Sequence, residues 1–211
     1  EKALRVTSGV PERVLLHCVT SYPAPEEEYN LRVLTALSHI FGIPVGVSDH
    51  SLDPVLIPVL SVACGGTVVE KHITLDNSGD GLDDPVALPP GAFARMTKAL
   101  RTAETQTPAE IIEHASIEYG RARVEAVLGT GKKRLAPSEE ANYRRTNRSI
   151  HFMRDMPAGA VIKERDIAVL RTEKILTPGM SPEFLPLVCG AVLAKKAKNG
   201  EGVTWEHLVV T

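Results

Sequence analysis

Two histidines stand where neighbouring predicted strands end, and their chemistry suits a shared metal ion. His50 closes the string SDH at 48–50, and His72 closes the string EKH at 70–72. Neighbouring parallel strands lie about 4.8 Å apart, so equivalent strand ends bring two side chains together. Imidazole binds Mn, Fe, Zn and similar metals, and carboxylates or waters complete the coordination shell. This spacing leaves two interpretations equally open: a shared metal site, or two strand-end histidines bonded only to backbone.

The elements that would hold these histidines alternate between strand and helix over the first 107 residues. Short apolar runs of strand length lie at 13–18, 44–48 and 67–70. Apolar residues at helical spacing predict helices at 26–41, 53–64 and about 91–105, the second of them capped by Asp53. Near-continuous apolar strands alternating with helices predict an α/β fold with parallel strands.

Two α/β architectures place chemistry at the carboxyl ends of parallel strands. In a (β/α)8 barrel these ends form the catalytic face, and in an open doubly wound sheet they line a crevice. Short, regularly spaced strands favour the barrel. No glycine-rich dinucleotide-binding loop opens any of the predicted helices.

The rest of the chain changes character after one or two further predicted helices at 109–128. Residues 129–146 are polar, charged and rich in turn formers, which predicts a linker. Residues 147–211 carry short segments separated by turns, typical of a small compact domain. We therefore expect a first domain at 1–128, a linker at 129–146 and a second domain at 147–211.

Composition narrows the possible partners and the compartment. The net charge of −2 gives no electrostatic reason to expect nucleic acid or an acidic membrane surface as a partner. No apolar run reaches the roughly 18 residues that a membrane span requires. The three cysteines, Cys18, Cys64 and Cys189, are far apart in apolar stretches, which predicts buried free thiols in a reducing cytoplasm.

Several ordered motifs resemble those of the N-acetylneuraminate (sialic acid) synthase family. The string HCVTSYP at 17–23 resembles the family's HCT-x-x-YP segment, and 48–50 resembles its SDH motif. EKHIT at 70–74 resembles EKHFT and is followed by Gly81-x-Asp83. The segment from residue 147 is similar to the antifreeze-like SAF domain that ends these synthases. The resemblance implies the C-terminal portion of a (β/α)8 TIM barrel followed by a small β-clip type SAF domain.

The family condenses phosphoenolpyruvate with an N-acylated hexosamine such as N-acetylmannosamine, giving a nine-carbon 2-keto sugar acid and phosphate. The resemblance implies a divalent metal, Mn²⁺ or Mg²⁺, that is held by His50 and His72 and polarises the sugar aldehyde. It also implies that Ser48 helps hold the substrate. Asp83 matches a carboxylate near the sugar hydroxyls, so we place Ser48 and Asp83 in the catalytic centre.

Three further residues are implied to contact substrate. Tyr22 and Thr20 follow the first strand, and Thr20 stands where many family members carry Asn. Arg171 matches an arginine of the SAF domain that reaches the sugar in the partner's barrel, which implies a homodimer with exchanged SAF domains. Its context is Arg-Thr-Glu, whereas the family has Arg-Pro-Gly. We expect Glu70 and Lys71 to point away from the ligand side of their strand, and assign them no role.

Other readings remain beside this one. A barrel needs eight strands and the sequence predicts three, without the family's catalytic glutamate and phosphate-binding lysines. We therefore expect a fragment that is inactive alone. The alternatives are a non-catalytic carbohydrate-binding or dimerisation module, a legionaminic, pseudaminic or spore-coat polysaccharide synthase variant, and an unrelated metal-dependent aldolase or hydrolase.

Overall fold

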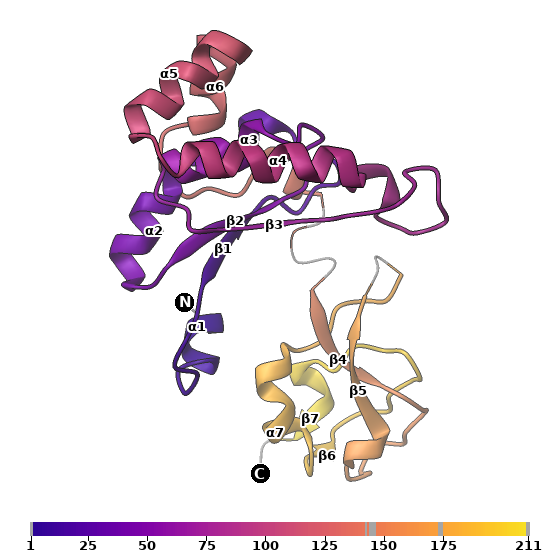
Figure 1. The fold of residues 1–211 in the computed structure, drawn as a ribbon. Helices are drawn as coiled ribbons and strands as arrows, with labels where there is room; N and C mark the ends of the chain where they lie inside the picture. The colour runs from indigo at the N-terminus through magenta and orange to yellow at the C-terminus, as the bar shows by residue number, and fades with distance from the viewer. Residues whose placement is uncertain (1, 142, 144–146, 173–174, 210–211) are drawn as a thin grey trace. The chain divides into compact units, whose positions relative to one another are not determined.

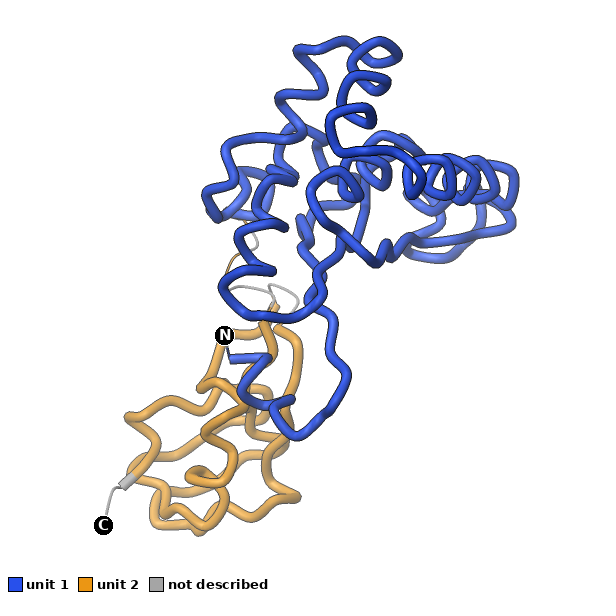
Figure 2. The backbone as a smooth tube through the Cα atoms, turned by 60° about the vertical axis from the view of Figure 1, so that its left-hand side comes forward, with its two compact units in different colours: residues 1–140 blue, residues 141–211 orange. Residues whose placement is uncertain are grey.

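The chain divides into two compact units, residues 1–140 and 141–211 (Figure 2). The computed structural model describes residues 2–141, 143, 147–172 and 175–209. Each unit has its own cluster of buried hydrophobic side chains.

The first unit is built on a parallel sheet with the strand order β1-β2-β3 (Figure 1). Its strands are β1 (Leu15–Cys18), β2 (Val45–Asp49) and β3 (Val68–Lys71). Its α-helices are α1 (Lys2–Val6), α2 (Val33–Phe41), α3 (Leu56–Ala63), α4 (Pro90–Ala103), α5 (Pro108–Tyr119) and α6 (Arg121–Leu128). The predicted parallel strands are confirmed.

The core of this unit lies between the sheet and the helices that cover one of its faces. Val45 and Val47 of β2 are buried against apolar residues of α2, α3 and α6. Gly46, between these valines, is needed because a Cβ there would lie 2.1 Å from the Val68 carbonyl oxygen of β3. Close contact of β2 and β3 fixes the distance between the strand ends that follow.

The helix predicted at 26–41 is wrong in its first half. The structure has a single 3₁₀ turn, η1 (Glu26–Glu28), and α2 begins only at Val33. Between them Asn30 adopts a left-handed backbone with φ of 49°, which ends any continuous helix. The amides of Leu31 and Arg32 donate to carbonyls at the end of α6, so tertiary contacts replace the helical bonds expected here.

The helix predicted at 53–64 begins later, at Leu56, with Val55 and not Asp53 at the N-cap position, but the Asp53 side chain still binds amides at its start. One carboxylate oxygen of Asp53 accepts from the amides of Val55 and Leu56 at 2.8 and 3.0 Å. These bonds satisfy amides that have no partner inside the helix. The cap thus fixes where the chain leaves the loop after β2 and enters α3.

The second unit contains two small antiparallel pairs. In one, β4 (Arg148–Phe152) pairs with β5 (Ile167–Arg171), and in the other β6 (Val192–Leu193) pairs with β7 (Leu208–Val209). One short helix, α7 (Leu185–Val188), lies between β5 and β6 in the chain. The buried side chains at its centre include Ile150, Phe152 and Leu193.

The surface departs from one expectation about the cysteines. Cys64 is buried as predicted and Cys18 is half-buried, but Cys189 is exposed, so the prediction of three buried thiols is wrong there.

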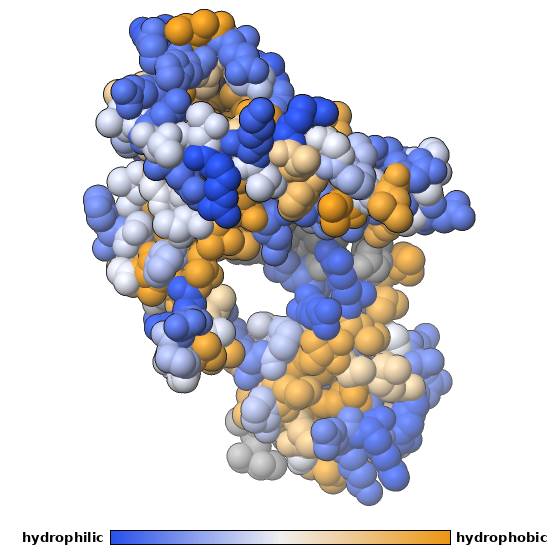
Figure 3. Space-filling model, in the orientation of Figure 1, coloured by the Kyte–Doolittle hydropathy of each residue, from blue (hydrophilic) through white to orange (hydrophobic). Residues whose placement is uncertain are grey.

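Hydrophilic side chains interrupt the hydrophobic ones over the visible face of α4 and α5 (Figure 3). No helix among the described residues is long and apolar enough to cross a bilayer.

Candidate functional site

The carboxyl ends of β1, β2 and β3 bring the predicted histidines together. Strand register pairs Ser48 with Glu70 and Asp49 with Lys71, so the residue after each strand lies at the same edge. The imidazole centroids of His50 and His72 are 5.3 Å apart. His50 is buried, whereas the His72 side chain is 35% exposed. The pair therefore has one sheltered and one solvent-accessible member.

The orientation of His50 is fixed by its backbone neighbours. Its Nδ1 lies 3.1 Å from the Val19 carbonyl oxygen. Because a carbonyl only accepts, Nδ1 carries the proton and Nε2 keeps its lone pair. Nε2 lies 3.5 Å from the Ser48 hydroxyl oxygen, but that hydroxyl gives its proton to Glu70, so the Nε2 lone pair remains available to a metal ion.

Tyr22 and Asp83 complete the surroundings of the two histidines. The Tyr22 ring stacks on His50 with centroids 4.1 Å apart and meets the edge of His72 at 5.8 Å. A carboxylate oxygen of Asp83 lies 3.8 Å from Nδ1 of His72. Thus the structure brings together four of the predicted site residues from three different loops: Tyr22, His50, His72 and Asp83.

Glu70 points to the same side as the histidines, so our expectation for it was wrong. The Ser48 hydroxyl donates to a Glu70 carboxylate oxygen at 2.6 Å. Residues i and i+2 of a strand share a face, and this alternation places Glu70 beside His72 and Ser48 beside His50. The sequence signal for Glu70 is its spacing of two residues from His72, which puts the two side chains on one face of the strand.

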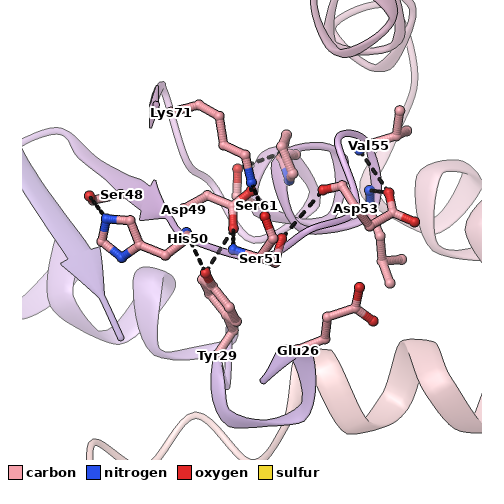
Figure 4. Close-up of polar contacts among 12 residues, drawn as sticks. Glu26, Tyr29, Ser48, Asp49, His50, Ser51, Asp53, Val55, Ser61 and Lys71 are labelled. Atoms are coloured by element: carbon pink, nitrogen blue, oxygen red, sulfur yellow. Dashed lines mark hydrogen bonds and ion pairs between the residues drawn. The ribbon is translucent and has the colours of Figure 1, made fainter. Parts of the chain in front are cut away.

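Lys71 does point to the opposite side, where it forms a buried ion pair with Asp49. Their charged atoms are 2.8 Å apart, and the two side chains are 1% and 0% exposed. The Tyr29 hydroxyl donates to the other Asp49 oxygen at 2.7 Å. Burial, and then the Asp49 charge, raise the pKa of the Tyr29 hydroxyl far above its usual range, so it stays a donor. Figure 4 shows these contacts beside His50.

The two other residues predicted to contact substrate are Thr20 and Arg171. The Thr20 amide and hydroxyl both donate to one Glu139 oxygen, at 2.9 and 2.7 Å, so its hydroxyl proton is engaged within the chain. Arg171 ends β5 in the second unit. The sugar-contacting roles of Thr20 and Arg171 stay predictions.

Among the described residues of this site, two imidazoles are the side chains placed to bind a metal ion. Across the described ranges, no group of three or more His, Cys, Asp and Glu side chains is arranged to hold a metal. Nε2 of His50 has the Ser48 hydroxyl oxygen 3.5 Å away, and the ring centroids of His50 and His72 are 5.3 Å apart. Water or substrate oxygens would have to supply the remaining ligands, as in sites that keep open positions for chemistry.

Comparison with known proteins places both parts of the chain. The model of the NeuB family matches residues 1–111, and that of the SAF domain matches residues 147–209. The N,N'-diacetyllegionaminic acid synthase of Legionella pneumophila is 32% identical over 92% of this chain and 48% of its own length. The human N-acetylneuraminate-9-phosphate synthase is 31% identical over 72% of this chain and 36% of its own.

A solved structure supports the same relationship. The spore coat polysaccharide biosynthesis protein SpsE of Bacillus subtilis matches with a TM-score of 0.80 and 28% identity, covering 100% of this chain and 56% of that one. The chain thus spans about half the length of SpsE and of the legionaminic acid synthase. The predicted fold class, a partial barrel with a SAF region, is confirmed. The family model covers more than half of the sequence, so this protein belongs to the NeuB family and carries a SAF domain after its barrel strands.

Proposed function

We propose that this chain supplies the metal and sugar side of a sialic acid-type synthase. The reaction joins phosphoenolpyruvate to an N-acylated hexosamine, forming a nine-carbon 2-keto sugar acid and releasing phosphate. The observation that supports it is the convergence of His50, His72, Asp83 and Tyr22 at adjoining strand ends. Membership of the NeuB family supports the reaction class.

The proposed roles follow from where each side chain lies. A divalent ion, Mn²⁺ or Mg²⁺, would be held by His50 and His72 and would polarise the aldehyde oxygen of the open-chain sugar. Asp83, which is 46% exposed beside His72, accepts hydrogen bonds from sugar hydroxyls. The Tyr22 ring covers His50 and limits the directions from which substrate approaches. Together these residues orient the aldehyde for attack by the carbon nucleophile.

The identity of the sugar is the finer part of the proposal. The relatives are named as synthases of N,N'-diacetyllegionaminic acid and of N-acetylneuraminate 9-phosphate, so the product differs within the family. We propose an N-acetylmannosamine-like substrate, and a homodimer in which Arg171 of each chain reaches the partner's sugar. Legionaminic, pseudaminic and spore-coat polysaccharide synthases are the close alternatives.

Calorimetry with Mn²⁺ tests the metal site directly. The parent chain should bind Mn²⁺, and a His50→Ala, His72→Ala double variant should lose binding. A His39→Ala, His114→Ala double variant is the matched control, because both histidines are exposed on helices of the same unit. The proposal fails if the His50, His72 double variant binds Mn²⁺ as the parent does.

A product assay tests the reaction and the sugar. It uses this chain joined to the N-terminal half of a full-length NeuB family member and supplies phosphoenolpyruvate with each of several N-acylated hexosamines. Formation of a 2-keto sugar acid that needs both histidines supports a synthase. Mn²⁺ binding without product from any sugar would favour the non-catalytic carbohydrate-binding module instead.

A further inference from the structure

Two charged residues that directly precede the proposed metal ligands are buried together beneath the sheet edge. Asp49 precedes His50 on β2, Lys71 precedes His72 on β3, and the two are register partners. Their side chains are 0% and 1% exposed, with 2.8 Å between the charged atoms. Burying two charges costs solvation that their attraction barely offsets, so such a pair is weak evidence for a stabilising role. Because each member of the pair directly precedes one proposed metal ligand, the pair can instead fix the geometry of the site.

Tyr29 connects this ion pair to the backbone of His50. Its hydroxyl donates to Asp49 at 2.7 Å and accepts from the His50 amide at 2.7 Å. Since β2 ends at Asp49, the His50 amide finds its partner in this hydroxyl and no longer in the strand ladder. The backbone of His50 is therefore held by this phenol oxygen at its amide and by the Ala24 amide, which donates to its carbonyl oxygen at 3.0 Å.

The residue after His50 is held by the same group of side chains. The Ser51 amide donates to the Asp49 oxygen that Tyr29 also contacts, at 2.9 Å, and the Ser51 carbonyl accepts from the Lys71 ammonium. Lys71 thus spans from the end of β3 to the loop after β2 (Figure 4). Asp49 and Ser51, on both sides of His50, are tied to the strand that carries His72.

We propose that Tyr29, Asp49 and Lys71 are positioning residues for the two-histidine site. They set the backbone of His50 and couple it to the strand end that bears His72, so that both imidazoles reach one point. The inference rests on the proposed metal-binding function. It assigns the ion pair to site geometry, and none of the three residues contacts the ion or the substrate.

Metal affinity gives the first test, with Zn²⁺ as the probe because imidazole binds it more tightly than Mn²⁺. Tyr29→Phe deletes one oxygen and keeps the ring, and Lys71→Met deletes the cross-strand charge. Each should weaken Zn²⁺ binding about 10- to 100-fold, the usual effect of removing a group that orients a metal ligand. Tyr119→Phe, the same chemical change on α5, should leave the affinity unchanged.

A second control separates positioning from general loss of stability. Val124→Ala removes buried volume from α6, remote in sequence from the ion pair. It should lower the melting temperature while Zn²⁺ affinity stays at the parent value below the transition. If Tyr29→Phe and Lys71→Met bind Zn²⁺ as Val124→Ala does, the inference is overturned.

A metal-free readout keeps the inference testable even if the proposed function fails. Nitrogen NMR of the imidazoles at alkaline pH should show His50 with its proton on Nδ1 in the parent, facing Val19. In Tyr29→Phe and Lys71→Met the displaced ring should populate the other tautomer. A parent-like His50 spectrum in both variants overturns the inference. A parent chain that binds no Zn²⁺ refutes the metal site alone, because the His50 spectra still decide the positioning.

Discussion

At the scale of single residues, His17 is a buried histidine whose neighbours keep it neutral. Its Nε2 donates to the Tyr29 carbonyl oxygen at 2.6 Å, and its Nδ1 lies 3.4 Å from the Lys133 ammonium, which donates to it. Burial, and then the positive charge of Lys133, lower the pKa of His17 below its ordinary value of 6.5. His17 shares the HCVTSYP motif with the site residues, but its bonds support the chain around Tyr29.

This lowered pKa predicts how stability changes with pH. Below about pH 6.5 the unfolded chain takes up a proton at His17 that the folded chain refuses, so acidification favours unfolding. The contribution is fully present above pH 6.5 and is lost as the pH falls toward the folded pKa. In His17→Gln, whose amide can still donate to Tyr29, this part of the pH dependence should vanish. Urea unfolding at several pH values measures it, and identical pH slopes for parent and variant would refute it.

The site residues show what a sequence reveals at this scale. His50 and His72 could be predicted because the residue type and the end of the apolar strand before it are both visible in a few consecutive residues of the sequence. Glu70 was misplaced, although the two-residue alternation that links it to His72 was available. The contacts of Tyr29 were not predictable, since they join η1 to the end of β2 across about twenty residues and depend on the register of the strands.

At the scale of elements, the cap of α3 offers a direct prediction. Asp53→Ala removes the acceptor for the amides of Val55 and Leu56 and should cost about 1 kcal/mol of unfolding free energy. Asp53→Asn keeps an acceptor oxygen and should cost less. Chemical denaturation of both variants checks this. Equal losses for Ala and Asn would instead assign the effect to the lost charge, 3.5 Å from Arg123.

Periodicity predicted the elements well where local signals and tertiary contacts agree. The helix expected at about 91–105 is α4, and the three strands lie within or one residue beyond their apolar runs. The segment 26–32 departs from its helical pattern because the Asn30 side chain forms two hydrogen bonds with a distant loop. Its amide nitrogen donates to the Lys132 carbonyl, and its amide oxygen accepts from the Gly131 amide. Such contacts across a hundred residues override local propensity and leave no local signal.

At the scale of the whole molecule, the two parts were recognisable because the motifs occur in order along the chain. Their division follows from two separate hydrophobic clusters, one around β2 and α3 and one around β4. Neither cluster contains a residue of the other unit. A boundary of this kind implies that the units are stabilised by different side chains.

Separate cores predict separate unfolding transitions. Leu34→Ala in the first unit and Phe152→Ala in the second each delete a fully buried side chain. Each change should cost about 2 to 5 kcal/mol of the unfolding free energy of its own unit, because a cavity replaces packed atoms. Scanning calorimetry should resolve two transitions, and each variant should lower only one of them. A single transition shifted by both variants would mean that the units unfold as one cooperative body, since a two-state protein has one transition for all its contacts.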